Sequence, residues 1–146
     1  MLKFKFPVIM VRDLEESIRF YEEIVGDRVT MSFDDDVHFE GGYALRQQDN
    51  PALGGFSDAM LRFEEDDIDG FARYLDDCQD VRYANRLKEA GNGQRMIRIL
   101  DPDGHVIEVV ENSELAIKRM LASGMTVGQV AAKSQYPIEY VQRFVR

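Results

Sequence analysis

The feature that most constrains the fold of this chain is an internal repeat within residues 1–111. Each copy opens with a strand-like alternation, continues with a helix that starts at an aspartate, and ends with three short strands. The helix-capping aspartates are Asp13 and Asp67, and Gly42 and Gly104 match near the ends of the copies. A β-α-β-β-β unit covers one face of its sheet with its helix and leaves the other open. Two such units are expected to pair around a cleft that can hold a ligand.

The pattern sets limits for each predicted element. In the first copy a strand runs to Val11 and a helix extends from Asp13 to Gly26, and the strands that follow are 28–33, 37–40 and 43–48. In the second copy a helix follows Asp67, and the strands are 59–64, 82–84, 95–100 and 106–110. We therefore predict an α+β fold with two paired βαβββ modules, about 1–50 and 56–111, and a helical extension at 112–146.

Two segments resemble the vicinal oxygen chelate superfamily. The segment from Val11 to Tyr21, VRDLEESIRFY, is similar to its strand-to-helix signature. The segment from Asp101 to Val109, DPDGHVIEV, is similar to the turn that leads to a glutamate in the last strand. This superfamily includes glyoxalase I, extradiol dioxygenases, fosfomycin-resistance enzymes and bleomycin-resistance proteins. The resemblance covers roughly residues 4–111 and implies the paired-module fold, a small-molecule cleft and assembly as a homodimer.

The resemblance also implies four positions where metal-dependent members carry ligands. In the last strand Ile107 and Val109 are apolar, so Glu108 is expected to point into the cleft. The matching positions in this sequence are occupied by Phe6, Arg46 and Met60. Phenylalanine and arginine do not coordinate a divalent metal, and a thioether is a poor ligand for a hard or borderline ion. We therefore expect neither a metal centre nor another cofactor.

Glu108 then has two interpretations. Arg46 lies at the repeat-related position, and Arg62 and Arg98 share the inward parity of Glu108. Either Glu108 and Arg46 form an ion pair that closes the interface between the modules, or Arg46, together with Arg62 or Arg98, holds an anionic group of a ligand. The rest of the predicted cleft is apolar, which suits a flat organic ligand but is also typical of simple packing or of contact with a second chain. Its residues are Phe6, Val8, Met10, Ala44 and Met60.

The net charge is −9, and it is unevenly distributed. Five basic and two acidic residues after residue 111 give the extension +3 and leave −12 for residues 1–111. A body this acidic disfavours nucleic acid as a partner. The sequence shows neither a signal peptide nor an apolar run of about 20 residues for a membrane span, and its single cysteine, Cys78, suits a reducing compartment. A cytoplasmic protein is expected.

The extension and the two histidines carry weaker signals. The segment 126–145 resembles a helix-turn-helix, although Gln135 stands where that motif favours glycine. It is interpreted either as a DNA-binding tail or as a helical cap. His38 is expected to be half exposed in a strand, with a role as a base left open, and His105 to be a solvated turn residue.

These observations favour a metal-independent protein of the glyoxalase/bleomycin-resistance type that binds a small organic molecule, anionic or aromatic, in its cleft. One alternative is a lyase, isomerase or dioxygenase that uses Glu108 as its catalytic residue, with a metal or as a lone base. A second alternative is a ligand-sensing regulator that uses the C-terminal helices.

Overall fold

The chain forms two compact units. The computed structural model describes residues 1–34, 36–48 and 59–145. The first unit comprises Met1–Met60 and Leu100–Val106, and the second comprises Leu61–Ile99 and Ile107–Arg146. The turn between the last two strands thus belongs with the first unit. The predicted module boundary, between residues 50 and 56, lies outside the described residues.

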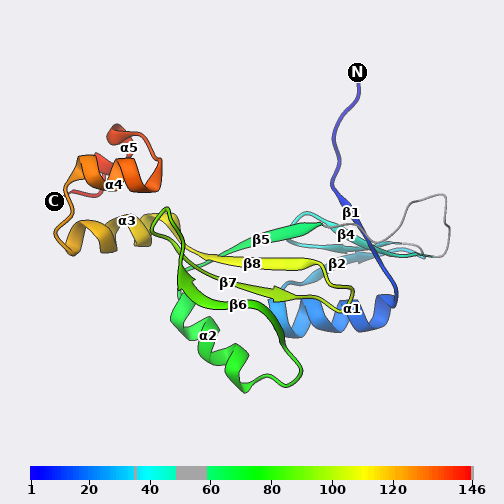
Figure 1. The fold of residues 1–146 in the computed structure, drawn as a ribbon. Coiled ribbons are helices and arrows are strands. Elements are labelled where there is room, and N and C mark those ends of the chain that lie inside the picture. The colour runs from blue at the N-terminus through cyan, green and yellow to red at the C-terminus, as the bar shows by residue number, and fades with distance from the viewer. Residues whose placement is uncertain (35, 49–58, 146) are drawn as a thin grey trace. The chain divides into compact units, whose positions relative to one another are not determined.

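The first module is a four-stranded sheet with its helix on one face (Figure 1). Its strands lie in the order β1-β4-β3-β2, with β1 parallel to β4 and the other neighbours antiparallel. Asp13 accepts a hydrogen bond from the Glu16 backbone N–H, as its predicted capping role requires. The helix ends at Gly26, where φ is +80°. The elements are β1 (Val8–Val11), α1 (Leu14–Phe20), a π-helical turn η1 (Tyr21–Val25), β2 (Val29–Ser32), β3 (Asp36–Phe39) and β4 (Ala44–Gln47).

The second module repeats this plan, with the strand order β5-β8-β7-β6. Asp67 accepts from the Gly70 backbone N–H and caps the helix, as predicted. The strand predicted at 82–84 is longer, because half-buried side chains continue to alternate beyond Ala84. The elements are β5 (Met60–Glu65), α2 (Ile68–Asp77), β6 (Arg82–Glu89), β7 (Arg95–Leu100) and β8 (Val106–Glu111).

The second sheet has a helix side and an open side. Figure 1 shows α2 against one face, and Arg95 of β7 donates two 3.0 Å hydrogen bonds to Asp69 of α2. Residues that share the parity of Arg95 are buried, notably Ile97 and Ile99 of β7 and the matching apolar residues of β8. Side chains of the opposite parity, such as Arg98 and Glu108, therefore belong to the open face.

Three helices follow the second module: α3 (Ser113–Ala122), α4 (Val127–Ser134) and α5 (Ile138–Gln142). They enclose a small core of Ile117, Met120, Val130 and Val141. A capping box is present at Thr126, with reciprocal hydrogen bonds to Gln129. The cap of α3 is Asn112, whose side chain accepts from the Glu114 and Leu115 backbone N–H groups.

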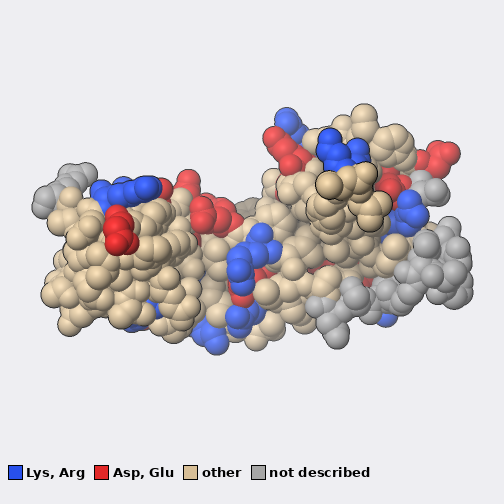
Figure 2. Space-filling view, turned by 90° about the horizontal axis from the view of Figure 1, so that it is seen from above, with Lys and Arg blue, Asp and Glu red and all other residues tan. Residues whose placement is uncertain are grey.

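The predicted α+β class, with βαβββ modules and a helical extension, is confirmed. Among the helices that the structure describes, none is both long and apolar enough to cross a membrane. On the face seen in Figure 2, acidic and basic side chains lie next to each other in small clusters, without a broad area of one sign.

Candidate functional site

A pocket of about 340 Å³ lies on the open face of the second sheet. Its sheet-derived lining comes from alternating positions of β5, β7 and β8, the parity predicted to face inward. The turn between β6 and β7 and the turn between α4 and α5 supply the rest. The lining residues are Arg62, Glu64, Ala90, Asn92, Gln94, Met96, Arg98, Glu108, Val110 and Tyr136.

Glu108 is the buried charge of this pocket, and two arginines hold it. Arg62 Nε donates to Oε1 at 2.6 Å and Arg98 Nε donates to Oε2 at 2.8 Å. Arg98 Nη1 also donates to Asn85 Oδ1 at 3.3 Å. The Glu108 side chain is 5% exposed, whereas that of Arg62 is 63% exposed. The carboxylate is therefore enclosed, and Arg62 extends from it towards solvent.

This environment keeps Glu108 ionised. Burial alone would raise the pKa of the carboxyl, but the hydrogen bonds and charges of Arg98 and Arg62 outweigh burial and bring it below its ordinary value. A carboxylate with a lowered pKa is a weaker base than a free one. Glu108 is thus better suited to orienting the arginines than to removing a proton from a substrate.

The first module has its own group of polar and aromatic side chains. The Phe6 and His38 rings are edge to face, with centroids 4.5 Å apart. Arg46 Nε donates to Asp36 Oδ1, and His38 Nε2 lies 3.8 Å from Asp36 Oδ2. Because Val37 and Phe39 are buried, the His38 side chain belongs to the opposite, open face of β3. The sequence did not show which face His38 would occupy.

The predicted site residues fall into separate groups. The second module brings Arg62, Arg98 and Glu108 together, and Glu108 forms ion pairs with both of these arginines. The ion pair predicted for Glu108 was with Arg46 of the first module, and it stays a prediction. Among the other predicted residues, Phe6 and Arg46 join the first-module group, and Val8 pairs with Ala44 in the register of β1 and β4. Met60 is 48% exposed at the start of β5.

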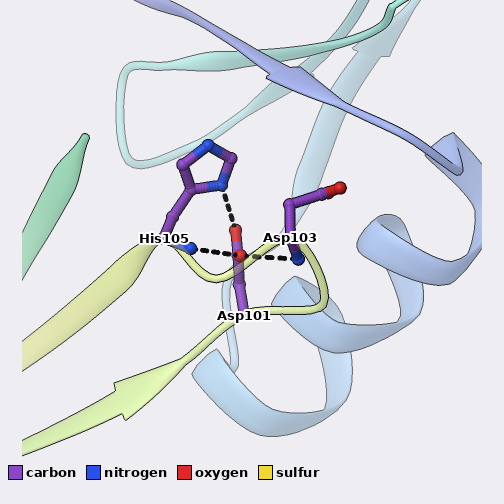
Figure 3. A group of neighbouring side chains, drawn as sticks. All are labelled: Asp101, Asp103 and His105. Carbon is purple, nitrogen blue, oxygen red and sulfur yellow. Dashed lines mark hydrogen bonds and ion pairs between the residues drawn. The ribbon is translucent and has the colours of Figure 1, made fainter. Parts of the chain in front are cut away.

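The DPDG turn holds a buried polar cluster (Figure 3). Asp101 Oδ1 accepts from the backbone N–H groups of Asp103 and His105, and Oδ2 lies 2.8 Å from the Tyr21 hydroxyl and 2.7 Å from His105 Nδ1. The prediction of a solvated His105 is wrong, since the residue is 1% exposed. Asp101 turns the imidazole inward, and this hydrogen bond raises the pKa of His105 against the effect of burial.

This cluster could in principle hold a metal ion, since Asp101, Asp103 and His105 offer ligand atoms within 4.8 Å of one another. Both oxygens of Asp101 already accept two hydrogen bonds each. In Figure 3 the carboxylate of Asp103 points away from the imidazole, and its Oδ1 accepts from the Arg12 backbone N–H at 3.1 Å. The arrangement is therefore that of a structural turn, which is tied to Tyr21 of η1 and to Arg12, just before α1.

The residues at the four family metal positions do not fit a metal either. Glu108 alone among them has a carboxylate, and both of its oxygens accept from arginines. Arg46 brings a positive charge, and the ring of Phe6 lies against His38. A divalent cation would have to displace guanidinium groups from Glu108 without gaining the three or more ligands that such ions require.

Several lining residues were missed from the sequence. Asn92 and Gln94 lie in a predicted connection, where alternation gives no facing direction. Asn85 is not a lining residue, but it accepts a hydrogen bond from Arg98 and was missed as well. It lies beyond the predicted end of β6, and recognising the longer strand would have placed it. Tyr136 comes from the extension, and no sequence signal connects it with the sheet.

The comparisons with known proteins agree with this architecture. Residues 4–114 match the family model described as glyoxalase-like domain. A protein of unknown function from Agrobacterium tumefaciens is 31% identical, with a TM-score of 0.63 over 77% of this chain and 95% of that chain.

Two further solved structures share the fold at lower identity. A lactoylglutathione lyase from Agrobacterium tumefaciens is 19% identical, with a TM-score of 0.60 over 73% of this chain and 92% of its own. A glyoxalase-related enzyme from Fulvimarina pelagi is 19% identical, with a TM-score of 0.60 over 76% and 89%. No curated protein matches the sequence. Motifs, fold and family model together show that the chain belongs to the glyoxalase-like domain family, within the vicinal oxygen chelate superfamily.

Proposed function

We propose that this protein binds a small organic molecule with an anionic group, on the open face of its second module and without a metal ion. The observation that carries the proposal is the arrangement of Arg62 and Arg98 around the buried Glu108 at the pocket. A volume of about 340 Å³ is in the range of sites for small ligands.

The charge of the cluster supports an anionic group. Two guanidinium groups share one carboxylate, so the three side chains carry a net charge of +1. Each arginine uses its Nε towards Glu108, which orients the rest of the guanidinium group. A guanidinium fixed in this way can bind a carboxylate through two parallel hydrogen bonds. Glu64 also lines the pocket and is exposed, as Arg62 is, so water and salt screen both of these charges. The case for an anionic group therefore rests on the two oriented guanidinium groups rather than on the net charge of the lining.

The same contacts support binding rather than metal-assisted catalysis. A lyase, isomerase or dioxygenase that used Glu108 as a ligand or base would need this carboxylate to leave both arginines. That change would place unpaired charge in a largely buried position, which is costly. A ligand that binds the arginines from the solvent side leaves the Glu108 contacts in place.

A titration of the purified protein with 2-naphthoate in the presence of EDTA tests the proposal. This probe combines a carboxylate with a small apolar body, and calorimetry is expected to show one site per chain. Arg62→Gln should weaken binding about tenfold or more, since it removes a charge-assisted contact worth upwards of about 1.4 kcal/mol.

Arg86→Gln is the matched control. Arg86 is also an exposed strand arginine, but it pairs with Asp76 of α2 on the other side of the same sheet. The proposal expects unchanged affinity in this variant. Absence of binding to the unmodified protein, or equal effects of the two substitutions, would overturn the proposed function.

A further inference from the structure

The C-terminal extension supplies part of the ligand pocket. Tyr136, in the turn between α4 and α5, lines the pocket together with residues of the second sheet. Among the described lining residues it is the only aromatic one. It also lies outside residues 4–114, the segment that matches the family model. The pocket wall therefore includes a side chain that the family domain itself does not provide.

Specific contacts fix the extension to the sheet. Arg119 of α3 donates from Nη2 to Glu111 Oε1 at 2.8 Å and to the Gly93 carbonyl oxygen at 2.7 Å. Glu111, the last residue of β8, is 4% exposed and also accepts from the Arg95 backbone N–H. Lys133 of α4 lies 3.6 Å from the carboxylate of Glu89. The extension is thus joined to β8 and to the β6–β7 hairpin, which also borders the pocket.

Local structure holds Tyr136 in its place. Gln135, just before it, has a φ of +67°, which ends α4 and turns the chain. The Tyr136 backbone N–H donates to Ser134 Oγ at 3.3 Å. The Tyr136 ring stacks on Tyr140 of α5, with centroids 4.8 Å apart and an interplanar angle of 25°. One face of the Tyr136 ring is therefore taken up by Tyr140, and the residue also lines the pocket.

We propose that Tyr136 determines specificity by selecting ligands that are flat and aromatic next to their anionic group. This inference rests on the proposed function and adds the class of ligand to it. The arginines recognise the anion, and Met96 and Val110 of the sheet supply apolar contact. The Tyr136 ring adds a stacking surface, which a flat ring matches and a puckered saturated ring does not.

Two matched probes test this role, 2-naphthoate and its saturated counterpart decahydro-2-naphthoate. They share the carboxylate and the fused-ring skeleton, and only the first is flat. The unmodified protein should bind the aromatic acid about three- to tenfold more tightly, the range expected for one aromatic pair. Tyr136→Ala should reduce this preference to near onefold, and Tyr136→Phe should retain it.

Two further variants test whether Tyr140 holds the Tyr136 ring in position and whether any substitution in this segment changes the preference. Tyr140→Leu removes the ring on which Tyr136 stacks and should reduce the preference without touching the pocket directly. Ile138→Ala is the matched control, since Ile138 is 45% exposed in the same segment and does not line the pocket. This variant should keep the full preference.

The possible results separate the two proposals. Equal affinity of the unmodified protein for both acids, or a preference that survives in Tyr136→Ala, would overturn the role of Tyr136. In either case, binding that still depends on Arg62 would continue to support the proposed function. Binding that is insensitive to Arg62→Gln would contradict the proposed function itself.

Discussion

Glu108 occupies a position of the family motif, but its partners are arginines rather than a metal ion. Its carboxylate lies where metal-dependent members carry a ligand, yet it is bound by Arg62 and Arg98. A buried carboxylate needs such partners, because an unpaired charge in this position would be strongly destabilising. The arginines therefore stabilise the module as well as shaping the pocket.

Glu108→Gln is expected to lower the free energy of unfolding at pH 7 by about 1–2 kcal/mol, since hydrogen bonds to a charged group are replaced by weaker ones. The pKa of Glu108 is lowered in the folded protein, so its stabilisation is present above the ordinary value of 4.5 and is lost as the pH falls through the folded value. The difference between the two proteins, measured by urea unfolding, should shrink as the pH falls below the ordinary value of 4.5.

The control for this prediction is Glu64→Gln. Glu64 is an exposed glutamate of β5 that lines the pocket on the same face as Arg62. Its effect should stay within about 0.5 kcal/mol at every pH. A loss in Glu108→Gln that is no larger than in Glu64→Gln would show that the Glu108 ion pairs do not stabilise the fold.

Strand parity explains which site residues could be predicted. Alternation along β5, β7 and β8 was enough to place Arg62, Arg98 and Glu108 on one face, because each strand has a clear apolar side. The same method says nothing about His105, since a turn has no alternation. Its burial depends on Asp101 and Tyr21, which are 80 residues apart in sequence, and such a contact leaves no local pattern.

At the scale of elements, the β6–β7 hairpin and α3 meet at Gly93. This glycine has a φ of +89°, and a Cβ added to it would lie 2.5 Å from Met120 Sδ. Met120 belongs to the core of the extension. A side chain here would therefore strain the backbone and force the end of the buried Met120 side chain to shift.

Gly93→Ala should destabilise the protein by about 2 kcal/mol or more, the sum of left-handed backbone strain and overpacking. Thermal unfolding followed by circular dichroism measures the effect. Gly91→Ala, in the same turn, has no atom within 4 Å of the added Cβ and no positive φ, so it should be close to neutral. Similar unfolding temperatures for the two variants would contradict the described contact between hairpin and α3.

Element boundaries followed from the sequence where capping chemistry was clear. Asp13 and Asp67 cap helices as expected, because a short polar side chain before an apolar periodic run has few other uses. Where two neighbouring residues are both of a capping type, the sequence does not show which one caps the helix. Asn112 caps α3, although the next residue is Ser113. The π turn at Tyr21–Val25 had no signal, because its residues keep ordinary helical spacing.

At the scale of the whole molecule, the repeat predicted the architecture because both copies must bury one sheet face against a helix. The family motif then named the fold, and the family model covers residues 4–114. The part that neither could give is the contribution of the extension to the pocket. It arises from tertiary contacts of Arg119, Met120 and Tyr136, whose residue types alone are ordinary for helices and turns.

We propose that this member of the family binds its ligand without a metal, and thermal unfolding with added Zn²⁺, Ni²⁺, Mn²⁺ or Fe²⁺ tests this proposal. A metal that binds only the folded state would add about 2.7 kcal/mol of stability at a hundredfold excess over its Kd. If binding is metal-free, none of the four ions should stabilise the protein in this way. 2-Naphthoate should stabilise it in the presence of EDTA. A large shift with one metal, abolished in Glu108→Ala, would contradict the account and make a metal-dependent enzyme the better interpretation.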